Sequence, residues 1–335
     1  MIDWTSAESH VMLNPRMPAG ERAALERAVP PLRGHVFVAT SGGSGEVKLV
    51  ALSKDTILAS AAAVNTRLEA RHDDVWYCVL PTFHVGGLGI HARAHLTGSR
   101  VISMAWDAKA FAATEATLAS LVPAQVHDLV RAALRSPAAL RLILVGGGVF
   151  DPELQQQARA LGWPVLASYG MSECASTIAV EEVLLPHLEA RAEEAGRLVF
   201  RGASLLSGYV YPDGRFSDPK VDGWFVSDDL GAVDGRRVRV DGRAGEVVKV
   251  GGETVNLAKL DRILREIAGD NAAIIAVPDE RLGHVIHLAT TVEAGAIVEA
   301  FNGRVLPFEW IREVHRVASI PRSPLGKLLR NRMLW

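Results

Sequence analysis

The amino-acid sequence predicts an α/β fold, with a large N-terminal domain of β-sheets covered by helices and a small α+β C-terminal domain. Short apolar runs that end at Gly or Pro, such as RLILVGGG and WPVLASYG, alternate with helical stretches in the first part of the chain. Such alternation favours a parallel sheet with helices on its faces. From Gly196 onward, β-forming residues and Asp-Gly turns predict a smaller, mostly antiparallel portion. We therefore place the large domain at residues 1–242 and the small one at residues 243–335.

Capping residues and apolar spacing predict the individual elements. The strand-like segment HVFVAT leads into a Gly-rich loop, and SKDTILASAAAVNTRL then predicts a helix capped by Ser53. VWYCVLP predicts a further strand, and residues 108–121 and 152–161 predict helices. In the small domain we expect a helix capped at Asn256, followed by the strands AAIIAVP and VIHLATTV.

The composition is that of a globular protein whose partners are small molecules. Of the 335 residues, 49% are hydrophobic and 22% are charged, which is enough apolar material for a sizeable core. The net charge is -2, with Lys and Arg scattered along the chain, so we expect no nucleic acid partner. The two cysteines form no disulfide pattern, and neither a secretory leader nor a long apolar stretch is evident. We therefore expect a cytoplasmic protein without stable membrane insertion.

The stretch TSGGSGEVK, which begins at Thr40, is the first candidate binding site. It is not a Walker A loop, because Lys48 precedes Leu49 instead of Ser or Thr, and it lacks the third glycine of a dinucleotide fingerprint. Its glycines nonetheless permit close backbone approach, and the hydroxyls of Ser41 and Ser44 suit phosphate oxygens. A solvent-exposed Gly/Ser turn is the alternative interpretation.

Two later stretches carry groups that suit a nucleotide. In SYGMSECAST, Tyr169 offers an aromatic face for a planar base, Gly170 permits close approach, and Glu173 offers a carboxylate of the kind that binds magnesium. A core tyrosine and a surface glutamate are the alternative there. In DGWFVSDDLG, the carboxylate of Asp228 or Asp229 on a turn suits the two hydroxyls of a ribose, or the stretch is a solvated Asx turn.

The last two stretches lie at the expected domain boundary and near the C-terminus. In GRAGEVVKVGGETV, Arg243 suits a phosphate, and the glycines suit a hinge, or the segment is a simple β-hairpin. In IPRSPLGKLLRNRM, Lys327 follows a turn constrained by Pro and Gly, where it could place a positive charge at a reacting carboxylate and phosphate. A basic tail is the alternative.

Taken together, the order and spacing of these motifs resemble those of the adenylate-forming enzymes, the family of acyl- and aryl-CoA ligases. TSGGSGEVK resembles TSGTTGxPK, LPTFHVGG resembles LP-x-FH-x-GG, YGMSE resembles YG-x-TE, GWFVSDDLG resembles GWF-x-TGDLG, GRAGEVVKVGGETV resembles GR-x-DD-x-IK-x-GG-x-x-I, and PRSPLGK resembles PR-x-x-x-GK. The resemblance covers roughly residues 36–330. It implies the fold of that family and an enzyme that joins a carboxylic acid to a thiol through an acyl-adenylate, with ATP, Mg²⁺ and coenzyme A.

The resemblance also implies roles for individual residues. Tyr169 would contact the adenine, Asp229 the ribose, and Glu173 the metal. The catalytic residues would be Lys327, Glu173 and His84, with Lys327 bridging the carboxylate and ATP in the first half-reaction. The complete ATP-binding set would be Thr40, Ser41, Gly42, Ser44, Gly45, Lys48, Gly147, Tyr169, Gly170, Met171, Ser172, Asp229 and Arg243.

Two stretches, FHVGGLGIHARAHL and YGMSECAST, further resemble the o-succinylbenzoate-CoA ligase branch of the family, which acts in menaquinone (vitamin K2) biosynthesis. That acid carries a second carboxylate on its benzene ring, so a cation is needed away from Lys327. Arg93 is the candidate, and a salt bridge to a nearby acid is its alternative role. Turnover of another carboxylic acid and non-catalytic AMP or ATP binding are the alternative functions of the whole protein. The resemblance implies an acid-binding set of His84, Arg93, Ser168, Ser176 and Thr177.

The chain departs from the family pattern at several positions. Gly43 replaces a hydroxyl residue, Val47 a proline and Leu49 a glycine, which loosens the loop but leaves its main donors. The expected hinge residue is Gly245, where the family carries Asp or Lys, so hinge control would rely on backbone freedom. Only 39 residues precede Thr40, far fewer than in familiar members, and we expect a shortened N-terminal subdomain. A homodimer is one arrangement that would cover the surface thus exposed.

Overall fold

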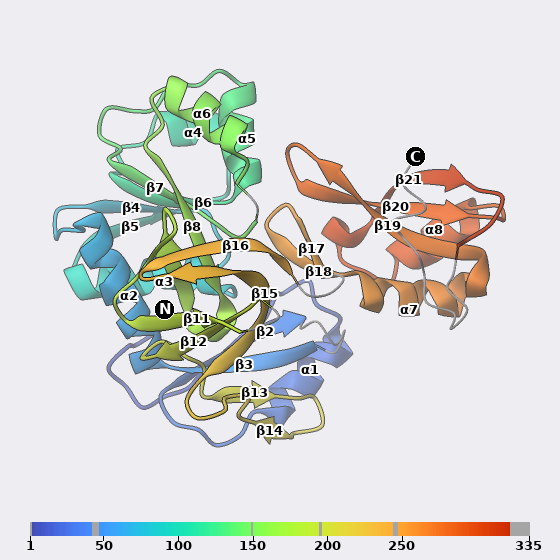
Figure 1. Ribbon diagram of the computed structural model, residues 1–335, viewed down its shortest axis with the longest axis horizontal. Coiled ribbons are helices and arrows are strands. Elements are labelled where there is room, and N and C mark those ends of the chain that lie inside the picture. The colour runs from blue at the N-terminus through green and yellow to red at the C-terminus, as the bar shows by residue number, and fades with distance from the viewer. Residues whose placement is uncertain (1, 42–46, 149, 194–195, 244–246, 322–335) are drawn as a thin grey trace. The chain divides into compact units, whose positions relative to one another are not determined.

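The computed structural model of the chain describes residues 2–41, 47–148, 150–193, 196–243 and 247–321 (Figure 1). These residues form two compact units, of which the first ends and the second begins between Arg243 and Val247. Within the described ranges, the helices are all too short or too polar to cross a bilayer.

One sheet of the first unit carries the strand that precedes the Gly-rich stretch. Its order is β1-β2-β3-β13-β14, with β1 parallel to β2 and β13 antiparallel to β3. Helix α1 (Ala19–Ala28) packs Leu25 against Phe37 and Leu49 of this sheet. The strand predicted from HVFVAT is confirmed as β2. The strands are β1 (His10–Met12), β2 (His35–Ser41), β3 (Val47–Ser53), β13 (Gly208–Val210) and β14 (Phe216–Ser217).

The other sheet of this unit is mixed, in the order β11-β12-β15-β16-β10-β9-β8-β7-β6-β4-β5. From β5 to β8 neighbouring strands run parallel, and from β8 to β11 they run antiparallel. Both the parallel part and the later antiparallel part are therefore as predicted. The strands are β4 (Val75–Cys78), β5 (Arg100–Ser103), β6 (Leu118–Leu121), β7 (Leu142–Val145), β8 (Val165–Met171), β9 (Ser176–Val180), β10 (Val183–Leu184), β11 (Leu188–Ala192), β12 (Arg197–Gly202), β15 (Phe225–Asp234) and β16 (Arg237–Arg243).

Helices cover both faces of the parallel strands. Successive side chains of a strand point to opposite sides, and here the side chains on both sides are apolar. The face that carries Tyr77 and Ile143 packs against α4, α5 and α6. The face that carries Trp76 and Leu144 packs against α2 and α3. The helices are α2 (Lys54–Leu68), α3 (Val85–Thr97), α4 (Ala108–Ala112), α5 (Pro123–Arg131) and α6 (Pro152–Ala160).

One predicted helix is wrong. Residues 108–121 are helical only as far as Ala112, and β6 occupies the end of the segment, between β4 and β7. All four residues of β6 are buried, and pairing on both edges suits this short apolar run better than an amphipathic helix does. The helix predicted at residues 152–161 is confirmed as α6, and the predicted cap of α2 is confirmed because the Ser53 side chain accepts a hydrogen bond from the first turn.

The second unit is a small α+β structure with the strand order β18-β17-β20-β19, and β21 pairs with β20. On one face of its sheet, α7 and α8 pack Leu260 and Phe301 against Ile286. The predicted Asn256 cap and the two predicted strands are confirmed. The elements are β17 (Val247–Val250), β18 (Glu253–Asn256), α7 (Leu257–Ala268), η2 (Gly269–Asn271), β19 (Ala272–Asp279), β20 (Gly283–Thr290), α8 (Gly295–Asn302), η3 (Pro307–Glu309) and β21 (Ile311–Arg316).

Candidate active site

Arg93 lies on α3 and is buried, with 2% of its surface exposed. Its Nη1 donates to Ser120 Oγ on β6 at 3.2 Å, and its Nη2 donates to Thr177 Oγ1 on β9 at 3.1 Å. The guanidinium carbon lies 5.6 Å from the centroid of the Trp76 ring, close enough for a cation–π contact. Two hydroxyls and one aromatic ring therefore surround this cation.

Within the described part of the chain, no carboxylate balances the charge of Arg93. Its buried Nε has no hydrogen-bond partner there. Burial lowers the pKa of Arg93 to about 10, so the side chain is still protonated at neutral pH. The salt bridge considered as its alternative role is therefore wrong for these residues. A buried guanidinium without an acid is costly, and an anionic ligand that reaches it would remove much of that cost.

Gly89 and Ser176 bound the space beside the guanidinium. A Cβ placed on Gly89 would lie 3.4 Å from Arg93 Nη2 and 3.6 Å from Ser176 Oγ. Ser176 Oγ lies 3.5 Å from Thr177 Oγ1, which accepts the hydrogen bond from Arg93. The fold thus brings Arg93, Ser176 and Thr177 together, and the missing side chain at position 89 keeps room between them.

His84 and Ser168 come from the elements next to this cluster. His84 is the N-cap residue of α3, and its half-buried ring lies 4.7 Å from that of Phe83. Ser168 lies on β8 and donates through Oγ to the carbonyl of Val145 at 3.1 Å. Their predicted contacts with the acid substrate stay a prediction.

The residues predicted to hold adenine and ribose contact each other directly. The hydroxyl of Tyr169 on β8 donates to Asp229 Oδ2 at 2.7 Å. Asp229 is 5% exposed, whereas the Asp228 side chain is 45% exposed and lies 4.0 Å from Arg197. Both aspartates lie on strand β15 and not on the predicted turn, because β15 pairs with β12 and β16 on either side. Strand alternation turns Asp229 toward Tyr169, and this contact favours Asp229 as the ribose ligand.

Glu173, the predicted metal ligand, lies on the short 3-10 helix η1 (Ser172–Cys174). Its Oε1 accepts a hydrogen bond of 3.0 Å from the hydroxyl of Tyr209 on β13. Lys48 Nζ lies 3.4 Å from the centroid of the same tyrosine ring. Burial, followed by the charge of Glu173, raises the pKa of Tyr209, so this phenol stays protonated and donates. A half-buried carboxylate whose tyrosine partner also contacts a lysine suits a magnesium ion shared with phosphate oxygens.

Gly170 is required by the close approach of β8 and β9. A Cβ at this position would lie 1.8 Å from the backbone oxygen of Ser176, so no other residue fits without moving a strand. Met171 ends β8 and Ser172 begins η1, so the predicted nucleotide-contacting residues run continuously from strand to turn. Gly147, in the loop after β7, has a φ of +79°, which glycine adopts most readily.

Several predicted residues lie outside the described ranges or lack a described side chain. Gly42, Ser44, Gly45, Gly245 and Lys327 lie outside the described residues. The backbones of Ser41 and Arg243 belong to β2 and β16, and Thr40 near the end of β2 is half-buried. Gly251 and Gly252 have φ values of +59° and +87° in the turn between β17 and β18. The β-hairpin interpretation is therefore confirmed for residues 247–256.

Sequence reasoning missed Trp76, Ser120 and Tyr209, which contact the predicted residues. Trp76 and Ser120 lie on buried parallel strands, where their local sequence is indistinguishable from that of core strands. Tyr209 reaches Glu173 only because β13 pairs with β3 across a long stretch of sequence. The one signal available was a polar Ser inside the apolar run LASL, which is unusual for a fully buried strand.

Comparison with known proteins gives a consistent result. A model of the AMP-binding enzyme family matches residues 23–206. A probable 2-succinylbenzoate–CoA ligase of Mycobacterium tuberculosis is 32% identical over 320 residues, which cover 88% of this chain and 82% of the relative. A 2-succinylbenzoate–CoA ligase of Staphylococcus epidermidis is 27% identical over 325 residues, which cover 88% of this chain and 68% of the relative.

A solved structure of a double mutant of o-succinylbenzoate CoA synthetase from Bacillus subtilis, bound to a product analogue, superposes with a TM-score of 0.79 at 24% identity. The match covers 89% of this chain and 68% of that chain. The predicted adenylate-forming fold is thereby confirmed. Since the family model spans more than half of the sequence, this chain belongs to the AMP-binding enzyme family.

Proposed function

We propose that this chain is an AMP-forming acid–thiol ligase that converts 2-succinylbenzoate and coenzyme A to 2-succinylbenzoyl-CoA in menaquinone biosynthesis. The observation that carries the proposal is the buried cation of Arg93, which two hydroxyls hold and no described carboxylate neutralises. An acid with a second carboxylate supplies the missing anion, whereas a fatty acid leaves the guanidinium unpaired. The names of the relatives at 32% and 27% identity support the same substrate.

In the first half-reaction, an oxygen of the aliphatic carboxylate attacks the α-phosphorus of ATP, the acyl-adenylate forms, and pyrophosphate leaves. Tyr169 and Asp229 hold the adenine and ribose, and their mutual hydrogen bond keeps both side chains in position before ATP binds. Glu173 would hold Mg²⁺, which would offset the negative charge of the phosphates. Thr40 and Lys48, with the loop between them, hold the β- and γ-phosphates.

In the second half-reaction, the thiol sulfur of coenzyme A attacks the acyl carbon, the thioester forms, AMP leaves, and the thiol proton passes to solvent or to a base. His84 at the start of α3 is proposed to contact the reacting carboxylate. Lys327 is proposed to bridge the carboxylate and ATP in the first step. The small domain, residues 243–335, is proposed to rotate about Gly245 and to withdraw Lys327 before the thiol enters.

The aromatic carboxylate of the substrate is proposed to bind Arg93, with Ser168, Ser176 and Thr177 completing the pocket. Thr177 already accepts from Arg93, and its own hydroxyl hydrogen can point either to Ser176 Oγ, 3.5 Å away, or to a carboxylate oxygen of the substrate. An anion there raises the pKa of Arg93 and offsets the cost of its burial. Specificity thus comes from a cation held away from the reacting centre.

ATP–pyrophosphate exchange, measured across a panel of carboxylic acids, tests the proposal. We expect exchange with 2-succinylbenzoate, and AMP release once coenzyme A is added. Exchange with benzoate or a medium-chain acid but not with 2-succinylbenzoate would assign a different acid to the same chemistry. ATP binding without exchange or AMP release for any acid would instead indicate a non-catalytic relative.

Two further properties of the whole protein are proposed, its compartment and its assembly. Cys78 and Cys174 are buried free thiols, which suits the reducing cytoplasm. A homodimer is proposed as the assembly, and light scattering of the purified chain tests it. A monomer at all concentrations would contradict it without affecting the ligase proposal.

A further inference from the structure

A cluster of three potential metal ligands lies in the second unit, on the sheet face opposite to α7 and α8. The parallel strands β20 and β21 pair His287 with Glu313 and Ala289 with His315. Side chains two residues apart in a strand point to the same face, so His287, Glu313 and His315 share one face. Apolar side chains of Ile275 and Ala289 lie on that same face. The three polar groups thus lie next to apolar side chains.

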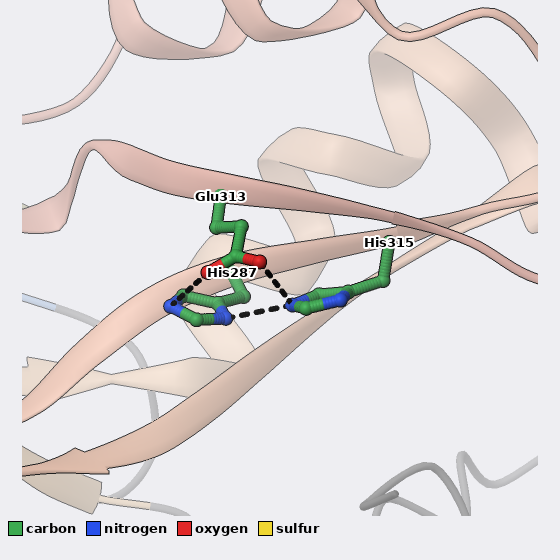
Figure 2. Close-up of side chains that lie close together, drawn as sticks. All are labelled: His287, Glu313 and His315. Carbon is green, nitrogen blue, oxygen red and sulfur yellow. Dashed lines mark hydrogen bonds and ion pairs between the residues drawn. The ribbon is translucent and has the colours of Figure 1, made fainter.

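The ligand atoms of this cluster already converge, all within 4.8 Å of one another (Figure 2). His287 Nδ1 and His315 Nε2 are 2.8 Å apart. Glu313 Oε1 lies 3.9 Å from His315 Nε2, and Oε2 lies 4.0 Å from His287 Nε2. The two imidazole rings stack with their centroids 5.0 Å apart. Strands β20 and β21 therefore bring two imidazole nitrogens and one carboxylate close to a common point.

We propose that His287, Glu313 and His315 bind a divalent transition metal, with Zn²⁺ as the cation that fits best. Two imidazoles and one carboxylate form a three-ligand set that zinc accepts, and Mg²⁺ and Ca²⁺ prefer oxygen ligands. The site is distinct from the magnesium site proposed at Glu173, and it does not rest on the proposed function. A solvent molecule completes the tetrahedron, because Glu313 is exposed at the open side of the cluster.

Small side-chain adjustments convert the present arrangement into a coordination shell. For metal–nitrogen bonds of about 2.0–2.1 Å, tetrahedral ligands lie roughly 3.3 Å apart. The two ring nitrogens therefore separate by about half an ångström and the carboxylate approaches by a similar amount. Glu313 has 62% of its side chain exposed and can make this movement. The hydrogen bond between His287 Nδ1 and His315 Nε2 is lost when the metal binds. The ring that donated this hydrogen bond then carries its proton on its other nitrogen, so both facing nitrogens can bind the metal.

The charges within the cluster suit a divalent cation. Zinc binds the neutral form of imidazole through the lone pair of a ring nitrogen, and both histidines present such a nitrogen to the cluster. Glu313 supplies the negative charge that offsets part of the metal's charge. The strands β20 and β21 hold the ligands, so binding also ties β21 to the sheet.

Titration of the full, tag-free chain with Co²⁺ and Zn²⁺ after chelation and buffer exchange tests this site. We expect one Co²⁺ per chain with the visible absorption of tetrahedral coordination, displaced by Zn²⁺, and a higher melting temperature with Zn²⁺. His287→Ala and His315→Ala should each weaken binding more than about 100-fold, a larger effect than the loss of an outer-shell partner. Glu313→Gln should also weaken metal binding, and because residue 313 is exposed this substitution should leave the core unchanged.

The matched control is His284→Ala, on the same strand but with its side chain directed to the opposite face. This variant should keep the Co²⁺ spectrum, the affinity and the stabilisation by Zn²⁺ of the parent. The proposal is overturned if the parent binds no Co²⁺. It is equally overturned if all three ligand variants bind the metal as tightly as the parent and the control do.

Discussion

Tyr209 donates a hydrogen bond of 3.0 Å to Glu173 while Lys48 lies over its ring at 3.4 Å. One side chain of β13 thereby connects the strand that follows the predicted phosphate loop with the predicted metal ligand. This relationship fixes the direction of the Glu173 carboxylate before any nucleotide binds. It also gives Tyr209 a positioning role that the motifs do not suggest.

Tyr209→Phe removes this hydrogen bond but keeps the aromatic ring under Lys48. Hydrogen bonds to charged groups contribute about 1.5–3 kcal/mol, so we expect a fall in kcat/KM of roughly 10- to 150-fold and a higher Mg²⁺ requirement. Tyr211→Phe, two residues along the chain, is the matched control and should behave as the parent. An unchanged Mg²⁺ titration of Tyr209→Phe would rule out the positioning role.

Arg93→Met should weaken binding of the acid strongly without destabilising the protein. Truncating one partner of a buried charge pair costs about 2–5 kcal/mol, or roughly 30- to 4,000-fold in affinity for 2-succinylbenzoate. The KM for ATP should stay the same. The buried Arg93 cation, which has no acid partner among the described residues, destabilises the unliganded parent. The melting temperature of the unliganded variant should therefore equal or exceed that of the parent. Equal losses of acid and ATP binding would reject the assigned role.

Asp229→Ala should weaken ATP binding while leaving the acid pocket intact. The variant removes the buried carboxylate that Tyr169 contacts and that the ribose hydroxyls would use, so we expect ATP affinity to fall by about 2 kcal/mol or more. Asp228→Ala, at the neighbouring exposed position, is the control and should change little. Calorimetric titration measures the ATP affinity of both variants. Similar losses of affinity in the two would show that Asp229 is not the ribose contact.

Gly170→Ala should destabilise the first unit strongly. The added methyl group would meet the Ser176 backbone oxygen at 1.8 Å, which forces β8 and β9 apart, so we expect a loss of more than about 3 kcal/mol in urea unfolding. Gly20→Ala in α1 has nothing within 4 Å of the new atom and should stabilise the helix by up to about 1 kcal/mol. Full stability of Gly170→Ala would contradict the strand spacing described above.

His187 makes the stability of the first unit depend on pH. Burial lowers its pKa to about 4, below the usual value of 6.5. Between these two pH values the unfolded chain binds a proton that the folded chain does not, so stability falls as the pH decreases from 6.5 toward 4. His187→Gln should flatten this part of the profile, whereas exposed His72→Gln should not. If the stability of the parent and of His187→Gln fell equally over this pH range, His187 would not be the cause of the pH dependence.

Much of the site could be predicted from local sequence, because each motif holds its residues on one element. Arg93 lies on the helix that follows the FHVGG motif, and Tyr169 and Glu173 come at the end of the strand expected in WPVLASYG. The false helix at residues 108–121 arose because a four-residue strand buried on both faces has no period of its own. The placement of Asp228 and Asp229 on a turn was wrong because pairing on both edges of β15 is a long-range property.

The sequence by itself determined the order of the elements, the family motifs and the class of chemistry, since these depend on residues close together in the chain. Only the tertiary structure decided which side chains meet. Ser120 and Thr177 reach Arg93, and Tyr209 reaches Glu173, because strand pairing brings separate segments together. The tertiary structure likewise decided that Arg93 lacks an acid among the described residues and that three potential metal ligands gather on β20 and β21. Burial and charge balance are sums over distant neighbours, so no local pattern encodes them.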